Sequence, residues 1–152
     1  MQMKDLCSVI DVVKALGPAA MSADQTAAVI DLQGYHSATV VLAIGAGGIT
    51  FDTSNYIEFT LRHSDDNVTY SDVTLADIFG DDAPASIVTS QDSKSSIKRL
   101  IAAHATATWY HIGYCGGKRY LELDIEFTGT HGTATPIGVG VIRGHPELLP
   151  AG

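Results

Sequence analysis

The sequence is poor in cysteine, in basic residues and in long hydrophobic runs, and each shortage argues against a class of protein. Its two cysteines, Cys7 and Cys115, are far apart and in no metal-ligand spacing, so we expect two reduced thiols rather than a disulfide framework. Nine Lys and Arg residues against 17 Asp and Glu residues give a net charge of -8, which removes the electrostatic attraction that nucleic-acid binding normally needs. No apolar run is long enough to span a membrane. We therefore expect neither nucleic acid nor a membrane as a partner.

Signatures of export and of catalysis are also missing. Asp5 and Asp11 interrupt the first apolar region, so we expect synthesis in the cytoplasm rather than export. The glycine-rich pieces at 45–48 and 138–144 lack the dinucleotide-binding spacing, and the six histidines stand singly, without the spacing of a helical metal-binding motif. We expect no cofactor, no metal site and no enzymatic activity.

The hydrophobic pattern that is present changes after the first residues. Five apolar residues recur at steps of three and four, as in a short amphipathic helix that ends at Gly17-Pro18: Leu6, Val9, Ile10, Val13 and Leu16. From Thr26 onward the apolar residues form short runs instead. These runs predict about eight strands, at 27–32, 38–44, 56–63, 68–75, 97–103, 108–115, 120–127 and 136–142.

Turn signals rich in Gly, Asp and Asn separate these runs, with the spacing that an all-β sandwich or barrel requires. A parallel α/β fold would need crossover helices, and only residues 89–101 could supply one. The chain of 152 residues suits a single domain. We predict an all-β fold, an antiparallel β-sandwich of jelly-roll type with a short N-terminal helix. It divides into a helical arm and linker (1–25), the sandwich (26–143) and a C-terminal tail (144–152).

The stretch from Ile57 to Ile78 predicts two strands and a turn. Apolar Ile57, Phe59 and Leu61 alternate with polar residues, which predicts a strand with one face in the core and the other in solvent. The short polar residues at 64–67 predict a surface turn.

Two side-chain clusters are candidates for binding. Glu122, Asp124 and Glu126 share one face of a strand and could hold calcium or act as a catalytic pair. We favour a solvated outer face, or one that pairs with basic residues: Lys98, Arg99, Lys118 or Arg119. The aromatic residues that could stack on sugars are Trp109, Tyr110, Tyr114 and Tyr120. Strand alternation points Trp109 and Tyr110 in opposite directions, so part of this set belongs to the core or to a subunit contact.

Several pieces of the sequence, spread over nearly the whole chain, together resemble a family of small structural proteins from tailed bacteriophages and prophages. The pieces are MKDL (3–6), VVKALGPA (12–19), IDLQGYHSATV (30–40), EFTL (58–61), SDD (64–66), GYCGGKRYL (113–121) and RGHP (143–146). The resemblance supplies no catalytic motif. By fold and context it is similar to the jelly-roll decoration, or cement, proteins that bind the outside of some phage heads.

This resemblance implies a virion protein on the outer capsid surface, made in the host cytoplasm. Its expected partners are the major capsid protein and further copies of itself, as a dimer or trimer. The candidate contact residues lie in the predicted helix, the acidic turn and the tail: Leu6, Ile10, Val13, Asp65, Asp66, Arg143 and His145. A head-to-tail connector, a tail component and a carbohydrate-binding module for host attachment stay open as alternatives.

Overall fold

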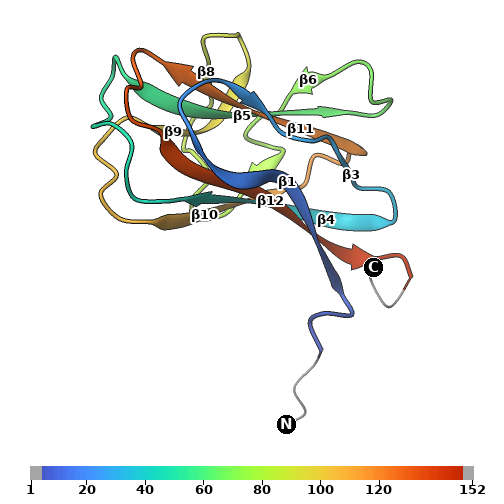
Figure 1. Cartoon of the computed structure of the whole chain (residues 1–152). Helices are drawn as coiled ribbons and strands as arrows, with labels where there is room; N and C mark the ends of the chain where they lie inside the picture. Colours follow the sequence, from blue (N-terminus) through green and yellow to red (C-terminus); the bar gives the residue numbers. More distant parts are fainter. Residues whose placement is uncertain (1–4, 149–152) are drawn as a thin grey trace.

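Two antiparallel sheets packed face to face form the protein (Figure 1). The computed structural model describes residues 5–148. Sheet 1 contains, in spatial order, β1 (Ile10–Met21), β12 (Thr135–Pro146), β4 (Tyr35–Ile44), β10 (Thr108–Tyr114) and β7 (Ile78–Phe79). Sheet 2 contains β2 (Gln25–Thr26), β11 (Tyr120–Thr128), β5 (Tyr56–Ser64), β9 (Ser95–Leu100) and β8 (Val88–Thr89), with β3 (Ile30–Asp31) beside β11 and β6 (Ser71–Asp72) beside β5. The predicted all-β antiparallel sandwich is confirmed for these residues.

The core lies between the sheets and is built by alternate residues of the longest strands. Val40, Leu42 and Ile44 of β4 point inward because successive side chains of a strand point to opposite faces. They pack in one cluster with Phe59 of β5 and Ile112 of β10, both fully buried. The residues between these inward positions are therefore displayed on the outer faces of the two sheets.

Most of the predicted strands correspond to long strands of the sandwich. The run at 27–32 instead contributes only to the short strands β2 and β3 at the edge of sheet 2. The run at 68–75 contributes only β6. Its first residues cannot extend because the Asp66 carboxylate accepts hydrogen bonds from the backbone N–H groups of Val68 and Thr69 and holds them in a turn.

The predicted N-terminal helix is wrong, since residues 10–21 form strand β1 and none of residues 5–148 is helical. The helix-like spacing arises because β1 carries apolar residues on both faces. Ala15 is buried in the core, whereas Val12 on the opposite face is 67% exposed. Pro18 does not end the element, because β1 lies at a sheet edge, where a proline needs no partner for its missing N–H.

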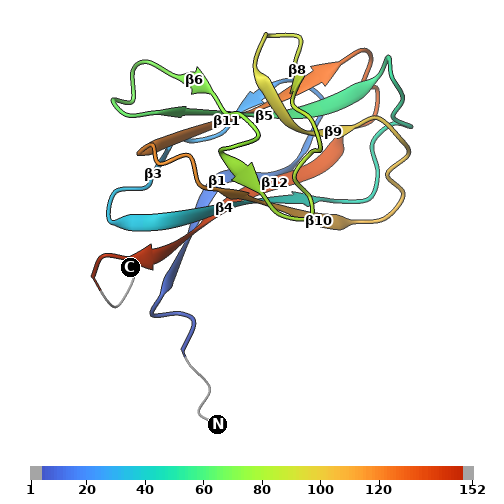
Figure 2. The same cartoon turned by 180° about the vertical axis from the view of Figure 1, so that it is seen from behind.

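The N-terminal half of β1 and the end of β12 extend together beyond the body of the sandwich, as the two opposite views show (Figures 1 and 2). Residues 1–4 of the predicted arm and 149–152 of the predicted tail lie outside the described residues. Within the described part of the chain, no helix is long and apolar enough to cross a membrane.

The outer face of sheet 2 is buried, which corrects the prediction of a half-solvated strand at 57–62. Glu58 is 0% exposed, although it alternates with Ile57 and Phe59 of the core. The chain between β8 and β9 covers this face, and the Lys94 ammonium lies 2.7 Å from the Asp124 carboxylate. A strand covered on both sides shows no burial difference between its apolar and polar positions.

The acidic series is likewise not a solvated face. Asp124 and Glu126 are buried, and their cationic neighbour is Lys94. Glu122 pairs with Arg62 on the adjacent strand β5. None of the four expected basic residues pairs with this series in residues 5–148. The pairing follows from strand register and loop position, neither of which is visible in the sequence.

Candidate functional site

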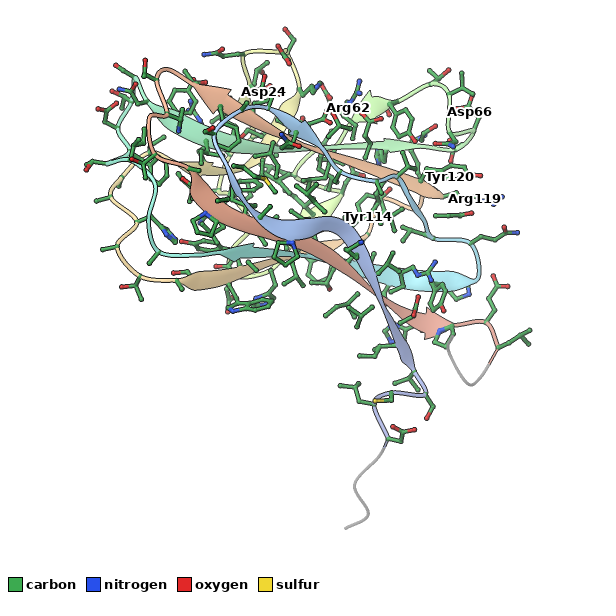
Figure 3. The ribbon with its side chains drawn as sticks, in the orientation of Figure 1. Asp24, Arg62, Asp66, Tyr114, Arg119 and Tyr120 are labelled. Carbon is green, nitrogen blue, oxygen red and sulfur yellow. The ribbon has the colours of Figure 1, made fainter. Side chains whose placement is uncertain are left out.

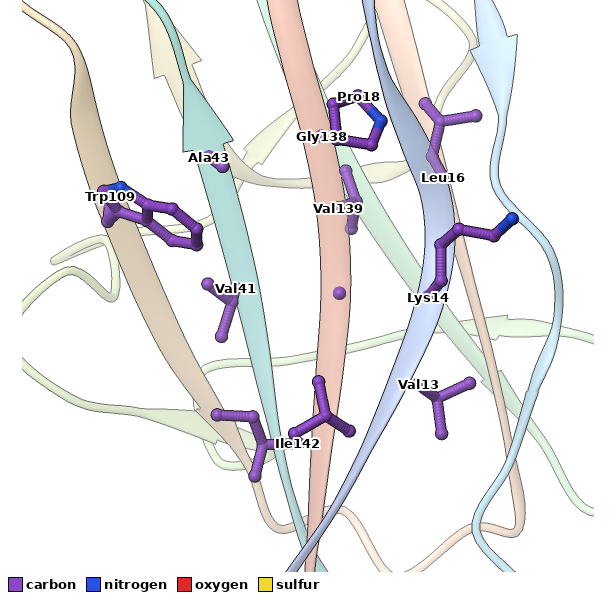
Figure 4. Close-up of a pocket in the computed structure, with 12 residues that line it drawn as sticks. Val13, Lys14, Leu16, Pro18, Val41, Ala43, Trp109, Gly138, Val139 and Ile142 are labelled. Atoms are coloured by element: carbon purple, nitrogen blue, oxygen red, sulfur yellow. The ribbon is translucent and has the colours of Figure 1, made fainter.

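The outer face of sheet 1 carries the largest exposed apolar groups that any strand presents to solvent. We call it the apolar face and define it by six residues from four strands: Val12, Pro18, Val41, Ala43, Trp109 and Ile142. Trp109 on β10 is 73% exposed and pairs in register with Ala43 of β4, which in turn pairs with Gly138 of β12. The residues therefore lie in adjacent rows across one continuous surface (Figure 4).

A shallow hollow of about 370 Å³ runs along this face. Its floor consists of β12 residues without bulky side chains, Gly138 and Gly140. A Cβ atom on Gly138 would lie 3.2 Å from the ring of Pro18, so β1 already packs closely over that position. Trp109 forms one wall and the residues of β1 form the other (Figure 4).

The chemistry of the apolar face is nearly free of hydrogen-bonding side chains. Lys14 contributes the charged group among the residues that line the hollow. His111, two residues after Trp109 on the same strand face, is directed to Asp82, with 3.3 Å between the imidazole Nδ1 and the carboxylate. An aromatic ring surrounded by small aliphatic groups favours contact with another apolar surface over binding a polar ligand.

The predicted aromatic cluster divides as strand alternation requires. Trp109 is exposed, whereas Tyr114 is buried between the sheets (Figure 3). The Tyr114 hydroxyl lies 2.9 Å from His63 Nδ1. Burial raises the pKa of the Tyr114 hydroxyl to about 12 and lowers the pKa of His63. This buried pair is a structural contact of the core. Trp109 is the most exposed member of the set, and Tyr110 and Tyr120 are half-buried.

The three predicted contact residues near the N-terminus occupy different environments. Leu6 is exposed in the turn that precedes β1. Ile10 begins β1 and is half-buried, and Val13 packs against the core from the inner face. Of these three side chains, Leu6 is the most exposed.

Asp65 and Asp66 lie in the surface turn after β5, as predicted, and Figure 3 shows Asp66 in this turn. The Asp65 carboxylate is 2.7 Å from the Lys118 ammonium. Asp66 accepts backbone hydrogen bonds from Thr69 and Val68, which lower the pKa of its carboxyl to about 2. Both carboxylates therefore help to hold the local structure.

Arg143 and His145 lie in the last residues of β12. The Arg143 guanidinium pairs with Asp11, donates a 2.8 Å hydrogen bond to the Asp31 carbonyl and lies over the Tyr35 ring. His145 is exposed, adopts a positive φ of 52° and lies 2.8 Å from the Ser37 hydroxyl. The structure therefore brings Ile10 beside Arg143 and His145, because Ile10 is in register with Gly144 between them, but it does not gather all the predicted contact residues into one site.

A buried network of charges lies under the loop over sheet 2. Lys94 lies between Asp124 and Glu126, and Arg99 Nε lies 2.6 Å from the Glu58 carboxylate. Burial raises the pKa of Glu58, the Arg99 charge opposes this shift and the Glu126 charge adds to it. No group of three or more His, Cys, Asp or Glu side chains in residues 5–148 is placed to hold a metal ion. The network fits a role in fixing the loop.

The sequence indicated Trp109 but missed the rest of the apolar face. The available signal was the run VVLAI in β4 and the small residues at 138 and 140 in β12. A strand that is apolar at every position predicts burial on both faces. In sheet 1 nothing in the described chain covers the outer face, so the same pattern produces an exposed apolar surface.

No protein-family model matches the sequence, and no curated protein matches it either. Two solved structures are similar in fold. One is the SPBc2 prophage-derived protein YomS, with a TM-score of 0.46 and 10% identity over 92% of this chain and 98% of that chain. Another is the CBM36-1 domain of a multidomain xylanase from the hindgut metagenome of Trinervitermes trinervoides, with a TM-score of 0.44 and 6% identity over 90% of this chain and 98% of that chain. Both similarities concern the sandwich fold alone.

Proposed function

We propose that this protein is a non-enzymatic virion structural protein of a tailed phage, a jelly-roll-type decoration protein that binds and stabilises the assembled head. The observation that carries the proposal is the apolar face of sheet 1, centred on Trp109. The sequence resemblance to phage structural proteins supports the assignment to a phage particle. The proposed partner is the major capsid protein, and the proposed site is the outer surface of the capsid.

The apolar face supports protein binding because it concentrates large exposed apolar groups in one patch. Val12 and Trp109 are 67% and 73% exposed and lie at the two sides of the same hollow. Monomeric soluble proteins rarely leave a contiguous patch of this kind uncovered. Tryptophan is also enriched among the few residues that dominate the free energy of binding at protein interfaces.

A decoration protein acts through binding alone. A protein that binds the assembled lattice and not the dissociated subunits stabilises the lattice by linkage. It needs a complementary surface and no active site. The net charge of -8 is compatible with an outer location, where the protein does not contact packaged DNA.

The test is co-sedimentation of the purified protein with assembled heads of the phage or prophage whose genome encodes it. Binding in many copies per head, with increased resistance of the heads to heat, is expected. Trp109→Ala should weaken binding by at least about 30-fold, because truncation of a central interface tryptophan costs about 2 kcal/mol or more. Val68→Ser is the matched control, since Val68 is exposed but lies in the loop after β5.

Two outcomes would contradict the proposal. If heads bind Trp109→Ala as tightly as the unchanged protein, the apolar face is not the surface that contacts the capsid. Occupancy of a single ring at one vertex would instead indicate a connector or a tail component, because such proteins form closed rings.

A carbohydrate-binding module is the second candidate, and the exposure of Trp109 on a sheet face favours it. Sugars stack on such rings but also require hydrogen-bonding groups beside them, and the neighbouring Ala43 and Gly138 supply none from their side chains. Trp109 is the single tryptophan of the chain, so its fluorescence reports directly on the site. A saturable fluorescence change with a glycan of the host surface would favour this candidate over the decoration role.

A further inference from the structure

β1 leaves part of its backbone unpaired at the edge of sheet 1. It is the outermost strand and pairs with β12 on one side. The Val13 carbonyl faces β12, because the Val13 carbonyl oxygen would lie only 3.5 Å from a Cβ atom added to Gly140 of β12. The N–H and C=O groups of successive residues point to alternate sides of a strand. Those of Ile10, Val12 and Lys14 therefore point away from β12, toward the open side of the sheet.

The bulges, the proline and the covering segment that protect β1 as an edge strand all lie in its second half. Register shifts follow Lys14 and Leu16, and Pro18 comes next. The Ala28 N–H donates a 2.8 Å hydrogen bond to the Ala15 carbonyl and covers the edge at that point. Bulges, prolines and covering segments are the usual means of preventing strand addition. In the first five residues of β1, by contrast, the pairing with β12 is regular.

We propose that this open edge, residues 10–14, pairs with the same edge of a second copy of the chain. Antiparallel pairing around a two-fold axis at Val12 places the Val12 residues of the two copies opposite each other. The same register places each Ile10 opposite a Lys14. All of these residues direct their backbone groups outward, so each of the three pairs exchanges two backbone hydrogen bonds.

The side chains of the open edge are self-complementary in this register. Val12 is the large exposed aliphatic group of the strand, and its counterpart in the second copy would cover it. Opposite Ile10, the aliphatic stem of Lys14 packs while its ammonium reaches solvent. Asp11, the carboxylate of the open edge, already pairs with Arg143, which limits the repulsion at this contact between two molecules that each carry a charge of -8.

The geometry leaves room for the second copy. The N-terminal half of β1 extends beyond the body of the sandwich in both views (Figures 1 and 2). A pair of five-residue strands buries less surface than the about 1,200 Å² or more of a standard stable interface. The dimer should therefore dissociate on dilution. The pairing joins the two copies of sheet 1 and places their apolar faces side by side. The inference does not rest on the proposed function.

Sedimentation velocity over a concentration series tests the pairing. The unchanged protein should shift from monomer to dimer as concentration rises. Val12→Pro should stay monomeric at those concentrations, because it removes an N–H that points to the open edge and leaves the ladder with β12 intact. Val12→Thr is the matched control, since it keeps both the N–H and the branched Cβ, and it should still dimerise.

Cross-linking tests the register independently of any loss of stability. In a Cys7→Ser/Cys115→Ser background, which removes both exposed native thiols, Val12→Cys should form a disulfide-linked dimer. Opposed residues of such a pair have Cα atoms about 5.5 Å apart, within the range of about 4.4–6.8 Å for a disulfide. Lys14→Cys should not cross-link, because Lys14 faces Ile10.

Three results would overturn the proposal. The first is a protein that stays monomeric while Val12→Cys cross-links no more than Lys14→Cys. The second is a dimer that Val12→Pro leaves unchanged, which would place the contact elsewhere. The third is an edge whose amides become protected from hydrogen exchange only on phage heads, which would identify a capsid strand as the occupant. Trp109→Ala should dimerise normally even where it fails to bind heads, so this result and the test of the proposed function are distinguishable.

Discussion

Replacing Arg99 by Met should isolate a buried carboxylate and destabilise the protein in a pH-dependent manner. Glu58 is 0% exposed, and its carboxylate lies 2.6 Å from Arg99 Nε. Arg99 also lies over the ring of Tyr56, with 4.5 Å between the guanidinium carbon and the ring centroid. Methionine retains much of the aliphatic stem that contacts this ring, so the change removes chiefly the charge.

The expected loss in the free energy of unfolding is about 3 kcal/mol at pH 7. Breaking a buried ion pair by removing one partner costs about 3–5 kcal/mol, and the lower end applies because the Arg99 side chain is 30% exposed. For a domain of this size, about 3 kcal/mol corresponds to a decrease in Tm of about 6–12 °C. Urea unfolding followed by Trp109 fluorescence and circular dichroism measures it.

The loss should shrink as the pH falls. Burial already raises the pKa of Glu58, and removal of the Arg99 charge should raise it further. A carboxyl whose folded pKa exceeds its unfolded value of about 4.3 binds protons more readily in the folded state, so stability recovers as the pH falls toward that value. The deficit of Arg99→Met relative to the unchanged protein should therefore be smaller at pH 5 than at pH 7.

The double variant Glu58→Gln/Arg99→Met is the control, and it should recover much of the lost stability because no buried charge remains at position 58. A deficit of less than about 1 kcal/mol at pH 7 would refute the reasoning, since it would assign this pair the energy of a surface ion pair. A deficit that stays constant between pH 7 and pH 5 would also refute it.

Three further changes should act on separate parts of the fold. Phe59→Ala should lower the free energy of unfolding by about 3–5 kcal/mol in a urea titration, because Phe59 is fully buried in the core. Asp66→Ala should be less stable than the unchanged protein at pH 6, and thermal scans should show the difference disappearing between about pH 4 and pH 2, since the folded pKa of Asp66 is about 2 and that stabilisation is lost on protonation. Gly48→Ala should lower the Tm more than Gly132→Ala, because Gly48 has a φ of +81° and an added Cβ would overlap the Thr135 hydroxyl, whereas Gly132 faces open space.

The long strands were predictable because each carries a complete local signal. In β4 and β11 the inward apolar positions recur every second residue, and polar turn residues bound the runs. The strand β1 was mistaken for a helix because its apolar residues lie on both faces, which mixes steps of two with steps of three and four. The turn at Asp66 was also predictable, since its hydrogen bonds join residues that are adjacent in the chain.

By itself the sequence determined the fold class, the long strands and the main turns, because these depend on alternation and on bonds within a few residues. The tertiary structure decided which strand faces are covered. It buried Glu58 under a loop that begins some 30 residues later, and it left the apolar face open by placing β1, β12, β4 and β10 side by side from distant parts of the chain. Neither outcome is encoded locally, because the exposure of a side chain depends on the segment that the fold brings to lie over it.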